Sequence, residues 1–197
     1  VLEPDTHFVD GWHIEAVCRH LEAITDGKIT RLLVNVPPGS MKSLMVSVFW
    51  PAWEWGPMNM PHLRYVTTSY KDDYVKRDAR RMRDLVASEW YQRLWGARVQ
   101  LVRTAETSFE NTRRGARDGM PFSALTGGRG DRVILDDPHS VDSAESELER
   151  ASTTRRFRES VPSRVNDPVR SAIVVIMQRL QEADVAGTIA RLKLPYV

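Results

Sequence analysis

One stretch of the sequence, residues 31–49 (RLLVNVPPGSMKSLMVSVF), restricts the fold more than any other. Its first six residues are mainly aliphatic and β-branched, two prolines and a glycine follow, and an apolar helix-like segment begins at Lys42 and Ser43. A strand, a short loop and a helix in this order are the layout of a phosphate-binding loop, in which backbone N–H groups and the positive end of the helix hold an anion. The stretch therefore predicts an α/β sheet with an anion site at the strand end.

The loop departs from the common pattern G-x-x-x-x-G-K-[ST], because Val36 and Met41 stand at its two glycine positions. Lys42 fits the lysine that reaches the β- and γ-phosphates of a nucleotide, and Ser43 fits the hydroxyl ligand of Mg²⁺. Taken alone, the same residues are equally consistent with a strand–helix turn that carries a surface lysine. Other parts of the chain have to distinguish these two interpretations.

A second strong signal is the run RVILDD at residues 132–137, which places three aliphatic residues before two acids. Such a run is typical of a buried parallel strand that delivers carboxylates to the carboxyl edge of the sheet, where open α/β sheets bind ligands. In a phosphate-loop enzyme Asp136 would hold Mg²⁺ through water, and Asp137 would orient or activate the attacking water. A loop and an acid pair in this order are much less common by chance than either alone.

Length and composition set the limits within which these motifs act. The chain has 197 residues, of which 42% are hydrophobic and 27% are charged, as in an ordinary folded protein, and this length fits one α/β domain. Its net charge of +2 does not by itself indicate nucleic acid, and its single cysteine excludes an intrachain disulfide framework. No apolar run is long enough to cross a membrane. We expect one soluble, intracellular domain.

The periodicity of apolar residues predicts strands that alternate with helices. Helices are expected at 14–24, 44–55, 72–88 and 142–158, strands at 31–36, 63–68, 132–137 and 171–177, short strands or a hairpin at 99–126, and an amphipathic connection or helix at 180–194. Pro51 should kink or end the second helix. This alternation predicts a mostly parallel sheet flanked by helices.

Two further features have two interpretations each. Trp12 and His13, just before the first helix, fit contacts with an adenine, or a buried tryptophan beside a capping histidine. The helix at 72–88 has a basic face that includes Arg77 and Arg81. That face fits a solvated surface, or a contact with DNA phosphate or with the nucleotide of a neighbouring subunit.

Taken together, these motifs resemble the N-terminal ATPase domain of the large terminase subunit of tailed bacteriophages. The resemblance covers nearly the whole chain and rests on GWHIEAVCRHLEAI, VNVPPGSMKS, TTSYKDDYVKRDARRMRDLVASEWYQRLWG, LTGGRGDRVILDDPHS and IVVIMQRLQEADVAG. It implies a P-loop NTPase fold of the ASCE, RecA-like class in a single domain over residues 1–197. A linker to a C-terminal nuclease domain that is absent from this sequence would begin near 180–197.

The resemblance also implies roles for individual residues. Gln178 would sense the γ-phosphate at the end of the last strand, with a solvated strand-end glutamine as the alternative. Arg129 would act on the nucleotide of a neighbouring subunit, with Arg77 and Arg81 as the alternatives. The implied nucleotide contacts are Pro38, Gly39, Ser40, Met41, Lys42 and Ser43, together with Trp12 and His13; the implied catalytic set is Lys42, Asp137, Arg129 and Gln178; the implied metal ligands are Ser43 and Asp136.

The implied function is hydrolysis of ATP, with Mg²⁺, that drives double-stranded viral DNA into a procapsid in the host cytoplasm. The implied partners are the DNA, a portal protein, a small terminase subunit and copies of the same chain in a ring. No acidic cluster follows residue 180, so we do not expect this chain to cut DNA. Two alternatives stay open: another nucleic-acid-dependent P-loop motor such as a helicase, or a non-catalytic scaffold whose degenerate loop binds no nucleotide.

Overall fold

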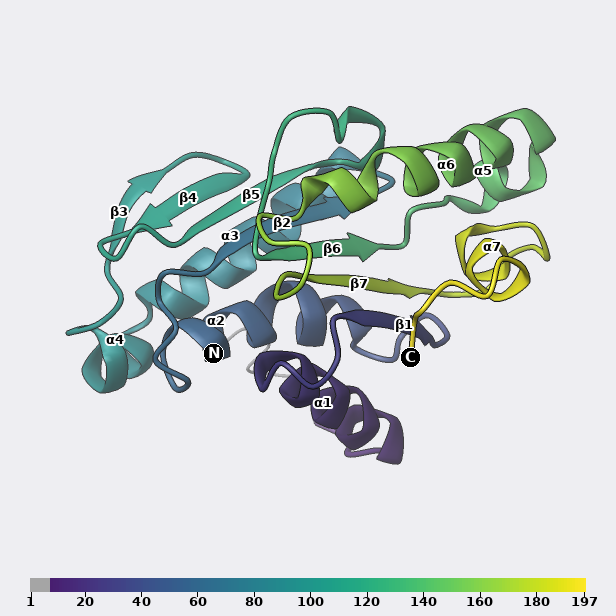
Figure 1. Cartoon of the computed structure of the whole chain (residues 1–197). Coiled ribbons are helices and arrows are strands. Elements are labelled where there is room, and N and C mark those ends of the chain that lie inside the picture. Colours follow the sequence, from purple (N-terminus) through teal and green to yellow (C-terminus); the bar gives the residue numbers. More distant parts are fainter. Residues whose placement is uncertain (1–7) are drawn as a thin grey trace.

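The computed structural model describes residues 8–197 and places a seven-stranded sheet at their centre, in the order β1-β7-β6-β2-β5-β4-β3 (Figure 1). The strands are β1 (Arg31–Asn35), β2 (Arg64–Ser69), β3 (Leu101–Thr104), β4 (Ser108–Asn111), β5 (Ala116–Pro121), β6 (Arg132–Asp136) and β7 (Ala172–Met177). The strands from β1 to β5 in this order pair in parallel, whereas β4 and β3 form an antiparallel extension. The predicted mostly parallel sheet is confirmed.

Helices cover both faces of this sheet (Figure 1). They are α1 (Trp12–Thr25), the π-helix η1 (Leu44–Phe49), α2 (Trp50–Trp55), α3 (Asp72–Ala87), α4 (Glu89–Trp95), α5 (Val141–Glu145), α6 (Glu147–Glu159) and α7 (Val185–Arg191), with 3₁₀ turns η2 (Phe122–Ala124) and η3 (Val161–Arg164). Helices α1 to α4 and η1 contribute to one hydrophobic core, while α6 and α7 contribute to a second core.

Strand β7 shows why the sheet needs cover on both faces. In β7, Val174 and Ile176 point into the first core, whereas Ile173 and Val175 point into the second. Successive side chains of a strand point to opposite faces, so a strand that is covered on both faces has a continuous apolar sequence. This is the reason why the run SAIVVIM was recognisable as a buried strand.

Of the two outcomes expected at Pro51, a kink or an end of the helix, the structure excludes the end. The chain does not end its helix there but continues to Trp55, and it changes from π-helix to α-helix at Trp50, whose N–H donates to the Met45 carbonyl five residues earlier. Pro51 is the second residue of α2, directly after the change of helix type. Because proline has no N–H to donate to the preceding turn, the helix changes its type at the place where that bond is missing.

The helix expected at 142–158 is divided into α5 and α6. Ser146 lies between them with an extended backbone, and its hydroxyl accepts a hydrogen bond from the Glu149 N–H. A serine that caps a helix in this way satisfies one of the first free N–H groups, so it starts a new helix instead of continuing the old one.

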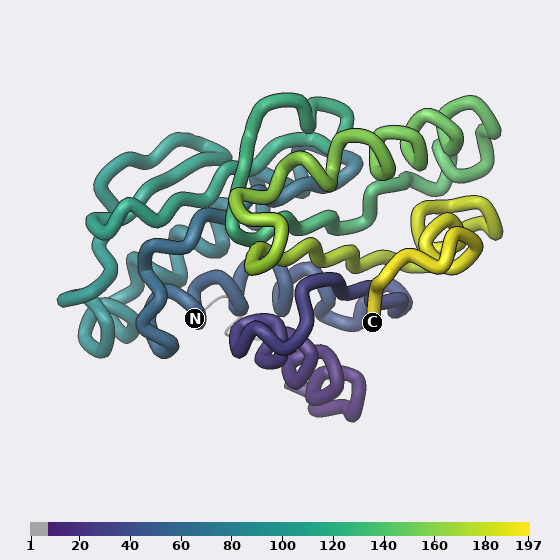
Figure 2. Tube along the Cα trace, viewed as in Figure 1, coloured from purple at the N-terminus to yellow at the C-terminus, as the bar shows by residue number. Residues whose placement is uncertain are grey.

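The last residues of the chain belong to the same fold. Helix α7 packs in the second core, and the backbone of Val197 bonds to Arg31 and Leu33 on the edge of β1 that β7 leaves free, as the C-terminal end beside β1 in Figure 2 shows. A linker near 180–197 stays a prediction. None of the helices in the described part of the chain has the length and apolar character that a membrane crossing requires.

A buried ion pair ties the start of β6 to α2. Arg132 Nη2 lies 2.8 Å from Glu54 Oε1, and Glu54 is fully buried. The carboxylate of Glu54 also accepts hydrogen bonds from the hydroxyls of Tyr65 and Thr25, at 2.7 and 2.9 Å. These bonds satisfy a charge that would otherwise be costly to bury.

Replacement of Glu54 by glutamine should therefore destabilise the protein. The variant leaves the Arg132 guanidinium buried without a counter-charge, so we expect the free energy of unfolding to fall by about 3–5 kcal/mol. Urea unfolding followed by circular dichroism measures this loss. As the matched control, Glu15→Gln removes an exposed ion pair with Arg19 and should change the free energy by less than about 1 kcal/mol. Equal losses in the two variants would contradict the role of the buried pair.

Candidate nucleotide-binding site

The parallel strands bring the predicted site residues to one edge of the sheet. In the observed register Asn35 at the end of β1 lies beside Met177 of β7, and Asp136 at the end of β6 lies beside Ser69 of β2. The phosphate loop follows Asn35, Asp137 follows β6, and Gln178 follows β7. Three segments that are far apart in sequence therefore meet at this edge because all three strands run in the same direction.

The loop adopts a glycine-like conformation at two positions. Gly39 has a φ of 80° and Met41 a φ of 59°, and the Ser40 hydroxyl donates a hydrogen bond of 2.8 Å to the Pro37 carbonyl. A positive φ is unfavourable by about 1–2 kcal/mol for a residue with a Cβ, because this atom comes too close to the following carbonyl oxygen. Met41 thus takes the conformation for which the common pattern uses glycine, and Gly39 takes a similar one two residues earlier.

Lys42 points toward the acid pair. Its Nζ lies 2.8 Å from Asp137 Oδ2, and only 7% of the residue is exposed. Asp137 has a φ of 45°, and its second oxygen, Oδ1, accepts a hydrogen bond of 3.1 Å from the backbone N–H of Gln178. Of the four residues predicted to be catalytic, Lys42 therefore contacts Asp137 through its side chain, and Gln178 contacts it through its backbone N–H.

Asp136 is more deeply buried than Asp137, with 5% of the residue exposed. Burial raises the pKa of its carboxyl group to about 7, and the charges of Asp137 and Asp78 act in the same direction, while the nearby Ser43 hydroxyl and the charge of Lys42 oppose them. Ser47 donates a weak hydrogen bond of 3.4 Å to Oδ2 of Asp136. A carboxylate under such conditions gains from a nearby divalent cation.

A cavity of about 380 Å³ lies between the loop and α3, and this size suits a bound small molecule. The cations Lys42, Arg77 and Arg81 line it together with both acids. Arg77 donates two hydrogen bonds to Asp78, and its guanidinium lies over the ring of Tyr74 at 4.9 Å. The complete lining of the cavity is Pro38, Gly39, Met41, Lys42, Ser43, Leu44, Ser69, Tyr74, Arg77, Arg81, Asp136 and Asp137. Cations, backbone N–H groups and carboxylates together fit a phosphate chain with Mg²⁺.

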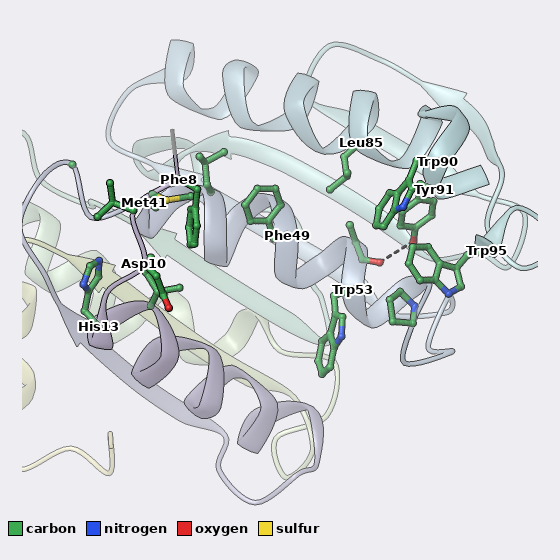
Figure 3. Close-up of a pocket in the computed structure, with 16 residues that line it drawn as sticks. Phe8, Asp10, His13, Met41, Phe49, Trp53, Leu85, Trp90, Tyr91 and Trp95 are labelled. Carbon is green, nitrogen blue, oxygen red and sulfur yellow. Dashed lines mark hydrogen bonds between the residues drawn. The ribbon is translucent and has the colours of Figure 1, made fainter. Parts of the chain in front are cut away.

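A larger and more apolar groove of about 910 Å³ adjoins this cavity, because Gly39 and Met41 line both. Figure 3 shows Met41, Phe8 and His13 at one end of it, whereas Trp53 and Trp95 lie at the other end. An apolar surface beside a phosphate site fits the base of a nucleotide. His13 lines this groove, and its contact with a base stays a prediction.

Two predicted residues lie away from this site. Trp12 is 83% exposed and lines neither the cavity nor the groove. Arg129 precedes β6 and so lies at the opposite end of that strand from Asp136, where its guanidinium donates to the Val165 carbonyl at 2.8 and 3.2 Å. The structure does not bring Arg129 to the nucleotide site of its own chain. Its action on a neighbouring subunit stays a prediction.

The oxygen ligands of this site fit Mg²⁺ better than a metal ion that is held by protein side chains alone. Ser43 and Asp136 supply hard oxygen atoms next to the phosphate loop, and Mg²⁺ is commonly held by one or two such groups together with nucleotide phosphates. Among residues 8–197, no group of three or more His, Cys, Asp or Glu side chains could hold a metal ion. A metal at this site would therefore need the nucleotide as a further ligand.

Several residues of the site were not predicted from the sequence. Tyr74 and Ser69 line the cavity, and Ser47 contacts Asp136 from η1. Asp78 is 3% exposed beneath Arg77, although it is charged. The available signal was its place on the apolar stripe of α3, between Val75 and Met82, where a charged residue is unexpected.

Asp136 should be a source of instability in the metal-free protein. The pKa of its carboxyl group is about 7 in the folded protein, above the usual value of 3.8. This group therefore costs the folded state nothing below about pH 4, where it is protonated in both states, and it lowers the free energy of unfolding as the pH rises from there toward and through 7. Asp136→Asn keeps the shape without the charge. At pH 8 in the presence of a chelator, we expect it to unfold with a free energy about 2–4 kcal/mol above that of the wild type.

Urea unfolding at pH 4 and pH 8 measures this difference, which should be small at the lower pH. The exposed Asp84→Asn variant is the matched control and should follow the wild type at both values. A wild-type protein as stable as Asp136→Asn at pH 8 would show that burial of this charge has no cost.

The comparisons with known proteins agree with this fold. No protein-family model matches the sequence, and no curated protein matches it. The crystal structure of the HK97 bacteriophage large terminase superimposes on 100% of this chain with a TM-score of 0.61 and 11% identity. The structure of a mutant ATPase domain of the Thermus phage P74-26 large terminase superimposes on 90% of it with a TM-score of 0.55 and 15% identity. This chain spans 40% and 66% of those two proteins, less than two thirds of either. The chain therefore has the fold of the ATPase domain of phage large terminases, as the sequence motifs predicted.

Proposed function

We propose that this chain is the ATPase domain of a large terminase and that it hydrolyses ATP, with Mg²⁺, to move double-stranded viral DNA into a procapsid. The observation that carries the proposal is the contact between Lys42 and Asp137 at the carboxyl-terminal edge of the sheet, where Asp136 and Gln178 also lie. The fold shared with phage large terminases supports it. Ring assembly, a portal protein, a small terminase subunit and the host cytoplasm belong to the same proposal.

Each residue of the site has a separate task in this mechanism. Ser43 and Asp136 would hold Mg²⁺, which would supply positive charge against the phosphate oxygens of the nucleotide. Lys42 binds the β- and γ-phosphates, and the helix that follows it directs its positive end to the same place. Asp137 orients the attacking water, which is the usual task of the acid at this position.

The ion pair suggests how binding and catalysis are linked. Lys42 Nζ and Asp137 Oδ2 lie 2.8 Å apart, so the two charges neutralise each other. A γ-phosphate competes with the carboxylate for the lysine, because its negative charge is greater. The arrival of the nucleotide therefore releases Asp137 for the water, and the water is activated only when a triphosphate is present.

Two hydrogen bonds connect this event with the C-terminal part of the chain. Asp137 accepts from the Gln178 N–H, and His139 Nε2 accepts from the Val185 N–H at the start of α7, at 3.2 Å. A movement of Asp137 therefore acts directly on the segment that follows β7. We propose that Gln178 passes the state of the nucleotide to this segment.

An arginine is needed to neutralise charge on the transferred phosphoryl group. Arg77 and Arg81 line the cavity of their own chain, which favours one of them for that task within the subunit. Arg129 is exposed and remains the candidate for the site of a neighbour in a ring. We propose that the chain alone does not cut DNA, because its sequence has no acidic cluster after residue 180.

Removal of the lysine or the acid tests the proposal directly. Lys42→Ala and Asp137→Asn should each lower the rate of ATP hydrolysis by at least about 10²-fold, because each removes a group that acts on the transferred phosphate or the water. Phosphate release in the presence of Mg²⁺ measures the rate. Lys28→Ala, which removes an exposed lysine bonded to Asp26, is the matched control and should keep the wild-type rate.

Wild-type rates in both site variants would contradict the proposal. Calorimetry with Mg²⁺ and an ATP analogue distinguishes a non-catalytic scaffold, which would not bind at millimolar nucleotide. Separation of duplex strands during hydrolysis would favour the other alternative, a helicase, over a motor that moves intact double-stranded DNA.

A further inference from the structure

A small polar cavity of about 10 Å³ shares Asp136 with the nucleotide-binding cavity. It lies between the strands β2, β5 and β6 and the helices η1 and α3. Its lining is Ser47, Thr67, Thr68, Ser69, Val75, Asp78, Arg117 and Asp136. Each of these residues is at most 5% exposed, so the cavity belongs to the interior of the protein.

Three buried polar atoms of this lining have no hydrogen-bond partner among the described residues. They are Thr67 Oγ1, Arg117 Nε and Asp136 Oδ1. A buried polar atom without a partner costs about 1–3 kcal/mol, so such atoms are rare and seldom adjacent. Their convergence on one cavity indicates a common polar ligand.

The charges around the cavity identify the class of ligand. The positive charge of the Arg117 guanidinium disfavours a bound cation, and the negative charges of the Asp78 and Asp136 carboxylates disfavour a bound anion. Burial lowers the pKa of Arg117 to about 10, while the charge of Asp78 acts in the opposite direction, so the guanidinium is charged at neutral pH. A volume of about 10 Å³ with three polar partners fits one water molecule, which both donates and accepts hydrogen bonds.

We propose that this cavity binds one internal water molecule, and that Thr67 and Arg117 act through it as positioning residues for the carboxyl group of Asp136. The water accepts from the Arg117 Nε–H, donates to Asp136 Oδ1 and bonds to the Thr67 hydroxyl. The other oxygen, Oδ2, is held by Ser47 at 3.4 Å. The carboxyl group is thereby oriented from both of its oxygens, as metal-binding carboxylates commonly are.

The neighbouring strand explains why Arg117 can reach this place. Gly119 of β5 pairs with Thr67 of β2, and a Cβ at Gly119 would lie 3.0 Å from Arg117 Nη1 and 2.6 Å from a methyl group of Val75. The absence of a side chain at position 119 therefore leaves room for the arginine to extend along the sheet beneath α3. The role of Thr67 and Arg117 in metal binding rests on the function proposed above for Asp136.

Thr67→Val tests the positioning role, since valine keeps the shape of threonine and removes only the hydroxyl. Electron paramagnetic resonance of Mn²⁺, in the presence of a non-hydrolysable ATP analogue, measures metal affinity without turnover. We expect Mn²⁺ to bind about tenfold more weakly to Thr67→Val, while the analogue binds equally well without metal. Thr67→Ser keeps the hydroxyl and should restore the affinity.

Thr188→Val is the matched control, because Thr188 in α7 is also buried with an unpartnered hydroxyl but lies outside this cavity. It should bind Mn²⁺ as the wild type does. Equal Mn²⁺ affinity in Thr67→Val, Thr188→Val and the wild type would overturn the positioning role.

A high-resolution crystal structure of the nucleotide-free protein tests the water itself. Density within hydrogen-bond distance of Thr67, Arg117 and Asp136 is expected, and a cavity without density would overturn the proposal. A wild-type protein that binds neither the analogue nor Mn²⁺ would contradict the proposed function instead, and the crystal structure would then decide about the water alone.

Discussion

The ion pair between Lys42 and Asp137 is the interaction on which the site depends. It joins the phosphate loop after β1 to the acid pair after β6, although β7 lies between these strands in the sheet. The backbone N–H of Gln178 after β7 completes the connection through the other oxygen of Asp137. Charges that are largely removed from water need such a complete set of partners, because the cost of burying them exceeds the attraction of an imperfect pair. The parallel register of the three strands supplies that set.

Several unfavourable features gather around this pair, whereas the opposite end of β6 is firmly held. Met41 and Asp137 both have a positive φ, and Asp136 carries a raised pKa because of its burial. Strain of this kind persists where the surrounding structure fixes it, and it is common at functional sites. The buried pair of Glu54 and Arg132 fixes the start of β6, at the other end of the strand from the acids. Stability at one end of the strand thus accompanies strain at the other.

The sequence was sufficient to predict features that depend on residue type at a strand end. The strands, the loop and the meeting of Lys42 with Asp136 and Asp137 followed from apolar runs that end in a turn or in acids. It was not sufficient where the outcome depends on register or on a local choice of backbone. Arg117 reaches its place only because Gly119 pairs with Thr67, and this pairing joins segments that are distant in sequence. The left-handed conformation of Met41 and the break between α5 and α6 likewise depend on the final packing.

The most direct test of this account is a crystal structure of the protein with Mg²⁺ and a non-hydrolysable ATP analogue. We predict that the γ-phosphate lies within hydrogen-bond distance of Lys42, that Asp137 has left the lysine and holds a water, and that Asp136 faces the metal. The same structure would show whether Arg77 or Arg81 of that chain, or Arg129 of a neighbour, contacts the phosphate. An intact pair of Lys42 and Asp137, with the analogue bound elsewhere or not at all, would contradict the account.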